Sequence, residues 1–160
     1  MTEIGGLPAH ILLIHAVVVL APVAGLLAVL FAVVTRLRGR LAWPLGILAV
    51  LLVPLSLLTA QAGEQLEHSM PESAAIEAHA QQGDLFKALA IAFVVVIAAQ
   101  IVTAFPEAIL RTPRLSGLRA FLKSRWLTGP VGILCLVGGL AMVYQSIVTG
   151  HSGASSVWGA

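Results

Sequence analysis

The chain has 160 residues, of which 59% are hydrophobic and only 10% are charged. Its mean hydropathy of +0.99 lies outside the range of ordinary soluble domains, so the composition predicts an integral membrane protein. The sequence carries no dinucleotide fingerprint, no phosphate-binding loop and no G-x-S-x-G motif, which argues against nucleotide-dependent enzymes and serine hydrolases. The single cysteine, Cys135, excludes an intramolecular disulfide.

Four stretches of the sequence are nearly free of charged side chains, and each approaches or exceeds the roughly 20 residues that a helix needs to cross the hydrocarbon. They predict transmembrane helices over residues 9–35, 41–63, 84–105 and 126–149. The residues before the first span contain no Lys or Arg, so we expect a permanent span rather than a cleaved signal. Gly138 and Gly139 predict close packing of the fourth span. We therefore expect one all-α domain over residues 1–160, a four-helix transmembrane bundle that itself carries the function.

Basic residues mark the predicted cytoplasmic side of this bundle. Eight of the nine Lys and Arg residues follow the first or the third span, and the positive-inside rule places these two loops in the cytoplasm. Both termini and an extended polar hairpin between the second and third spans are then outside. The pI of about 9.2 reflects the basic loops, for which anionic lipid is a better partner than nucleic acid. The eight residues are Arg36, Arg38, Arg40, Arg111, Arg114, Arg119, Lys123 and Arg125.

All five histidines fall on the predicted outer side. His15 lies five residues beyond His10, which places it about 7–8 Å deeper in the first span. An ionisable group at that depth costs free energy unless it is paired, ligated or in a wet cavity, so His15 is a functional candidate. The alternative is a neutral imidazole that forms a hydrogen bond across helices.

The other histidines belong to different helix ends. His10, His79 and His151 are expected at a similar depth, where they can converge on one site or remain separate polar residues of the interface. His68 is expected above them, near the apex of the hairpin, as a solvated residue. Glu64 lies four residues before His68, a spacing that places both on one helix face and that metal sites in helical bundles also use.

Two residues after His79 extend the candidate site. Gly83 lies four residues beyond His79 and leaves space beneath the imidazole for a flat ligand such as a porphyrin, although a packing glycine is an equal alternative. Asp84 can accept the second ring N–H of a ligating histidine and so fix its tautomer. As an acid near a helix start, Asp84 needs no such partner.

Short motifs along essentially the whole chain resemble a known family. The chain is similar to the bacterial membrane proteins of domain of unknown function 2231, in their actinobacterial form. The resemblance implies four helices in the bacterial inner membrane and no assigned activity. Some relatives are fused to or encoded beside Rieske iron–sulfur domains, which implies redox work with a Rieske-like partner. The motifs are Gly6-Leu7-Pro8-Ala9-His10 with His15, Gly63-Glu64 and Leu66-Glu67, His79 with Gly83-Asp84, and Gly150-His151-Ser152-Gly153-Ala154 with Trp158.

The first functional hypothesis is a small redox subunit that binds heme b near the outer surface. We expect His15 and His79, on facing helices, as its axial ligands. We expect Asp84 to tune the reduction potential of the iron, because a protein sets that potential through the axial ligands, the hydrogen bonds to them and the burial of the heme. His10, His151 and Gly83 complete this predicted cofactor site.

Two further hypotheses remain open at this stage. One is a non-heme site for copper, zinc or iron, whose ligands are His10, His15, His79 and His151, with Glu64 as a further candidate. The other is a non-catalytic accessory or assembly subunit of a membrane complex, in which the histidines only satisfy one another. Transport is disfavoured because four spans lack the repeated halves of common carriers, although a homodimer would supply them.

Overall fold

The computed structural model describes residues 3–4, 7–69, 71 and 73–158 of the chain. Four long helices dominate the fold: α1 (Ala9–Val33), α2 (Arg38–Glu67), α3 (Ala74–Ala104) and α6 (Arg125–Trp158). All four are long and apolar enough to cross a membrane, which confirms the predicted four-helix membrane bundle. Three of them run past the predicted spans. Helix α2 begins before residue 41 and ends after residue 63, α3 begins well before residue 84, and α6 ends well after residue 149.

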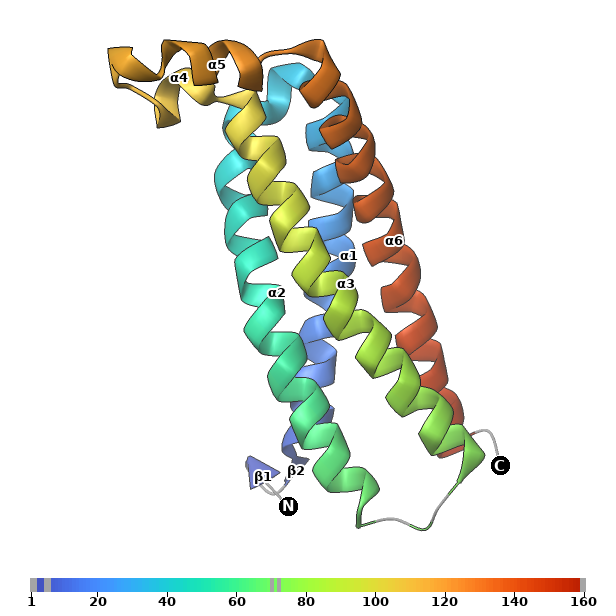
Figure 1. The fold of residues 1–160 in the computed structure, drawn as a ribbon. Helices are drawn as coiled ribbons and strands as arrows, with labels where there is room; N and C mark the ends of the chain where they lie inside the picture. The colour runs from blue at the N-terminus through green and yellow to red at the C-terminus, as the bar shows by residue number, and fades with distance from the viewer. Residues whose placement is uncertain (1–2, 5–6, 70, 72, 159–160) are drawn as a thin grey trace.

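The remaining elements are short and lie at the ends of the bundle. Strands β1 (Glu3–Ile4) and β2 (Leu7–Pro8) pair antiparallel before α1. The 3-10 helix η1 (Thr35–Leu37) connects α1 to α2. Three short elements connect α3 to α6 and project sideways from the bundle in Figure 1, namely α4 (Pro106–Ile109), η2 (Pro113–Leu115) and α5 (Ser116–Leu122).

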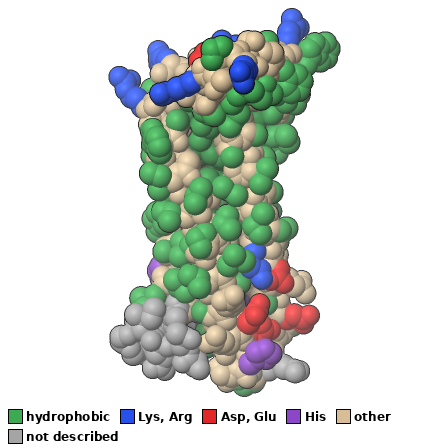
Figure 2. All heavy atoms as spheres, turned by 60° about the vertical axis from the view of Figure 1, so that its left-hand side comes forward, with side chains coloured by type: hydrophobic (Ala, Val, Ile, Leu, Met, Phe, Trp, Pro, Cys, Tyr) green, Lys and Arg blue, Asp and Glu red, His purple; other side chains and the backbone are tan. Residues whose placement is uncertain are grey.

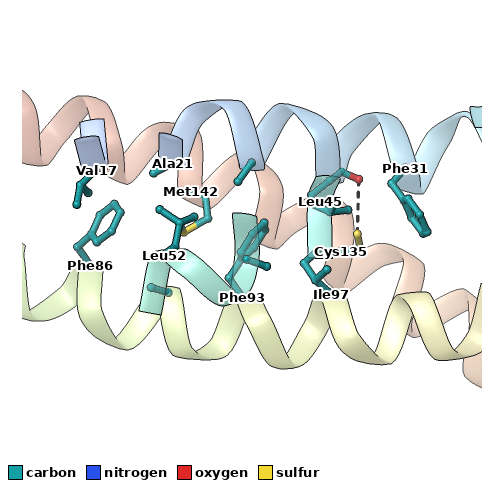
Figure 3. Close-up of a cluster of buried hydrophobic side chains, with 14 residues drawn as sticks. Val17, Ala21, Phe31, Leu45, Leu52, Phe86, Phe93, Ile97, Cys135 and Met142 are labelled. Atoms are coloured by element: carbon teal, nitrogen blue, oxygen red, sulfur yellow. Dashed lines mark hydrogen bonds between the residues drawn. The ribbon is translucent and has the colours of Figure 1, made fainter. Parts of the chain in front are cut away.

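The long helices pack as a closed ring in which each one contacts two neighbours. Helices α1 and α3 both pack against α2 and α6, so α1 and α3 occupy one diagonal of the bundle and α2 and α6 the other (Figure 1). Their buried side chains form a single core along the axis (Figure 3). Helix α1 contributes mainly alanines to this core, whereas α3 contributes Phe86, Phe93 and Ile97.

Glycines allow α1 and α6 to approach most closely. A Cβ atom built on Gly25 would lie 2.5 Å from the carbonyl oxygen of Gly139, and one built on Gly139 would lie 2.7 Å from the carbonyl oxygen of Gly25. The two backbones are therefore in direct contact, as small residues permit in membrane helices. This contact confirms the close packing that the glycine pair in the fourth span predicts.

The two ends of the bundle differ in charge. On the face shown in Figure 2, Lys and Arg side chains gather at one end and Asp, Glu and His side chains at the other. The start of α1, the end of α2, the start of α3 and the end of α6 lie together at the second end (Figure 1). We call it the histidine end, after His10, His68, His79 and His151. Its orientation in a membrane stays a prediction from the positive-inside rule.

Candidate functional site

Two imidazoles meet across the axis at the histidine end. His10 on α1 and His79 on α3 have ring centroids 6.0 Å apart, with ring planes 78° from parallel. Each lies seven residues before a buried residue of its own helix, Val17 in α1 and Phe86 in α3. Because seven residues make nearly two full turns, each histidine continues the core-facing stripe of its helix. The packing of the bundle therefore aims both side chains inward.

A glycine of a neighbouring helix lies against each imidazole. A Cβ atom on Gly63 of α2 would lie 3.0 Å from Cε1 and Nδ1 of His10. A Cβ atom on Gly153 of α6 would lie 3.0 Å from Cε1 of His79. The imidazoles thus occupy space that any other side chain at these positions would need. Two histidines on one diagonal and two glycines on the other form one layer of the bundle.

Hydrogen bonds assign the same tautomer to both rings. Nδ1 of His10 lies 2.9 Å from the carbonyl oxygen of Thr59, which can only accept, so Nδ1 carries the proton. Nδ1 of His79 lies 2.9 Å from Oγ of Ser152, whose own hydroxyl donates to the carbonyl of Thr149 at 3.0 Å. Oγ therefore accepts from Nδ1–H of His79. In both neutral rings the lone pair is on Nε2, the atom that a metal would take.

A cavity of about 690 Å³ opens beside this pair. Its volume lies within the range of about 300–1,000 Å³ that is typical of small-molecule and cofactor sites. All four long helices line it, and glycines contribute to the wall from three of them. A Cβ atom on Gly83 would meet no atom within 4 Å, so the wall is open there. The predicted site residues that line it are His10, His15, His79, Gly83, Glu64 and Asp84.

The structure places His79 against His10 rather than against His15, its predicted partner as an axial ligand. Five residues turn an α-helix by about 500°, so His15 lies roughly 140° around α1 from His10. When His10 faces the axis, His15 must face away from it. Its side chain is exposed, it lines the outer part of the cavity, and its Nδ1 lies 2.5 Å from the carbonyl oxygen of Ile11.

Asp84 also has a different partner from the predicted one. Its Oδ1 lies 2.8 Å from Nζ of Lys87, which also lies 4.0 Å from Oε1 of Glu64. Asp84 was expected to accept the second ring N–H of a ligating histidine, but the N–H groups of His10 and His79 are bound by the carbonyl of Thr59 and the hydroxyl of Ser152. Asp84 and Glu64 are exposed and form a charged rim of the cavity rather than its interior.

The remaining predicted ligands do not join the pair. His151 is exposed and is not part of the cavity wall, and its backbone carbonyl accepts a hydrogen bond from Ser155 of its own helix. His68 is exposed at the end of α2, as expected for a solvated residue. Among the described residues, no group of three or more His, Cys, Asp or Glu side chains is placed to hold a metal ion. The predicted four-histidine metal site is therefore not assembled in this part of the chain.

Comparison of the chain with protein-family models, with curated proteins and with solved structures gives no match. The resemblance to domain of unknown function 2231 therefore stays a prediction from the short motifs. What defines the protein is its site, a pair of inward-facing imidazoles beside a cavity at one end of a four-helix membrane bundle.

Proposed function

We propose that this chain is a small membrane redox subunit that binds heme b through His10 and His79. The observation that carries the proposal is the pair of imidazoles with centroids 6.0 Å apart. If both imidazoles bound one metal ion at about 2.0–2.1 Å, their ring centroids would lie at most roughly 6 Å apart. The observed separation of the pair is compatible with that value.

The surroundings of the two rings support the same role. Metal-binding histidines almost always donate their other ring N–H to a carbonyl, a carboxylate or water, which fixes the ring and raises its basicity. Thr59 accepts this hydrogen bond from His10, and Ser152 accepts it from His79. Both rings are therefore held in the tautomer that leaves Nε2 free for a metal.

The cavity beside the pair supports a flat, largely apolar ligand. Ile14, Val18, Ile76 and Ala80 line it with aliphatic surface, against which an apolar ring can pack. Gly83 leaves room at the wall where a side chain would stand. A bound heme supplies one-electron transfer at its iron, and its axial ligands and burial set the reduction potential.

We propose further that the histidine end faces outward from the bacterial inner membrane, since most basic residues lie at the opposite end. An electron partner that approaches from the outer side would meet the charged rim of Glu64, Asp84 and Lys87. The Rieske-like partner that the family resemblance implies would approach from this side.

A non-heme metal site is the weaker alternative. Zinc-like ions in proteins are usually held by three or four side chains, and the described residues offer no such group at this cavity. Two histidines beside a large apolar cavity are better suited to a macrocycle, which supplies four of the metal's ligands itself. An accessory subunit without a cofactor is the remaining alternative, and the experiment below separates it from both.

The test is a visible absorption spectrum of protein purified in mild detergent, first oxidised and then reduced with dithionite, with metal analysis of the same sample. We expect sharp reduced b-type bands at about one heme per chain. His10→Ala and His79→Ala should each abolish these bands, whereas the matched histidine variant His151→Ala should retain them. A fully helical wild-type protein that binds no added hemin would refute the proposal and favour the accessory subunit.

A further inference from the structure

His15 lies on the face of α1 that points away from the bundle. Leu12, Val19 and Val23 expose 40%, 61% and 44% of their surface on the same stripe of the helix. This helix is long and apolar enough to span a membrane, so the stripe faces lipid chains. An imidazole among aliphatic side chains at this depth costs free energy unless a polar group meets it. Nδ1 of His15 meets a carbonyl of its own helix, so its other ring nitrogen, Nε2, is the atom that needs a polar partner from the membrane.

The cavity extends from the imidazole pair to this outward face. Ile11, His15 and Val19 line it together with His10 and His79. Ile11 and Val19 are 39% and 61% exposed, so the wall that they form is open on its lipid side. Small residues of α6, Gly150 and Ala154, also line the cavity and leave space beside α1. A molecule dissolved in the lipid can thus reach the cavity laterally, past His15.

The hydrogen bond of His15 to its own helix determines what the imidazole can bind. Nδ1 lies 2.5 Å from the carbonyl oxygen of Ile11, and a carbonyl can only accept. The proton of the neutral ring is therefore on Nδ1, and Nε2 has a lone pair and no hydrogen. A ligand at Nε2 must donate a hydrogen bond, so a hydroxyl is accepted there and a carbonyl is not.

We propose that His15 is the hydrogen-bonding residue of a lateral binding site for a quinol, a membrane-soluble ring that carries hydroxyl groups. The open apolar wall requires a lipid-soluble ligand, and the tautomer of His15 requires a hydroxyl donor. The choice of a redox-active ring among lipid-soluble hydroxyl compounds rests on the proposed function of the His10–His79 pair. The site prefers the reduced quinol over the oxidised quinone, because only the quinol has an O–H to donate to Nε2.

The experiment compares a short-tailed naphthoquinol with its naphthoquinone, which differ only in oxidation state, on protein in lipid nanodiscs without oxygen. We expect saturable binding of the quinol, about fivefold tighter than that of the quinone, the ratio given by one hydrogen bond of ordinary net strength. His15→Ala should remove this preference. His151→Ala removes an exposed histidine that is not part of the cavity wall, so it should leave the preference unchanged.

A second measurement needs only the wild-type chain. In protein labelled with ¹⁵N-histidine, the Nε2 resonance assigned to His15 should shift when naphthoquinol is added and stay in place with naphthoquinone. Equal binding of the two forms, no saturable binding, or an unaffected His15→Ala variant would overturn the proposal. The absorption spectrum of the same sample reports heme binding separately. Heme bands without quinol binding would overturn the quinol site alone. Quinol binding without heme bands would support the quinol site and overturn the heme proposal.

Discussion

The contact between Gly153 and His79 gives a prediction whose size follows from the geometry. A methyl group added by Gly153→Ala would start 3.0 Å from Cε1 of His79. Carbon atoms are at optimal separation at roughly 3.5–4.0 Å, so the imidazole must retreat by about half an ångström. The hydrogen bond from Nδ1 to Ser152, now 2.9 Å, would then be stretched beyond the limit of about 3.2 Å for an N–H···O hydrogen bond.

The expected effect is large on heme binding and small on stability. Loss of a hydrogen bond that supports a metal ligand typically lowers affinity about 10–100-fold, and we expect that loss for heme in Gly153→Ala. The weakened hydrogen bond costs about 0.5–1.5 kcal/mol of stability. The gain of about 1 kcal/mol from replacing glycine by alanine in a helix offsets most of that cost. The free energy of unfolding should thus change by less than about 1 kcal/mol.

The assay is a hemin titration followed by visible absorbance, with thermal unfolding measured by circular dichroism on the same samples. Gly132→Ala is the matched control, because it lies on the same helix and an added Cβ atom would meet nothing within 4 Å. Gly153→Leu should abolish heme binding, since its side chain needs the volume of the imidazole. The reasoning is refuted if Gly153→Ala and Gly153→Leu bind hemin as tightly as Gly132→Ala.

Four further substitutions test other contacts. Ser152→Ala removes the acceptor of the His79 N–H and should weaken hemin binding about 10–100-fold, whereas Thr59→Ala keeps its backbone acceptor and should bind normally. In the packing of α1 on α6, Gly139→Leu should cost at least about 1–3 kcal/mol, measured by detergent unfolding, because the added side chain meets backbone at 2.7 Å. Asp84→Asn breaks a surface ion pair, so the free energy of unfolding should fall by less than about 1 kcal/mol and the hemin affinity measured by titration should not change. A tenfold loss of hemin affinity would restore the predicted tuning role of Asp84.

The four-helix fold was predictable because charge-free stretches of this length have few alternatives in a membrane. The helix ends were less predictable. Hydropathy reports where a helix leaves the hydrocarbon rather than where it stops. Residues of high helix propensity, such as Ala74, Glu77 and Gln81, extend α3 beyond its predicted span, whereas α6 continues through a Gly- and Ser-rich segment after residue 149 that helix propensity does not predict.

The pairing of His10 with His79 required the rotation of α1, which depth alone does not give. In soluble proteins a polar face marks the outside of a helix, but a membrane helix is apolar on both faces. The remaining signal in α1 is the spacing of small residues: Ala21, Ala24 and Ala28 are fully buried, and His10 continues their spacing while His15 does not. The sequence thus contains the correct register, but hydropathy does not reveal it.

The hydrogen-bond partners of the two histidines were the least predictable part of the site. The acceptor for His10 is the backbone carbonyl of Thr59, and every residue has such a group. Ser152 is selected only by the packing of α6 against α3. For Asp84 a local signal was present, since Lys87 lies three residues later on the same helix face, a spacing at which opposite charges pair.

Electron paramagnetic resonance of the oxidised, heme-loaded protein tests the central claim most directly, because it reports whether two imidazoles bind the iron. We expect a low-spin signal for the wild type and a high-spin signal for His79→Gly. Added imidazole should restore the low-spin signal by filling the vacated position. A low-spin His79→Gly protein without imidazole, or a high-spin wild type, would contradict the assignment of His10 and His79 as the two ligands.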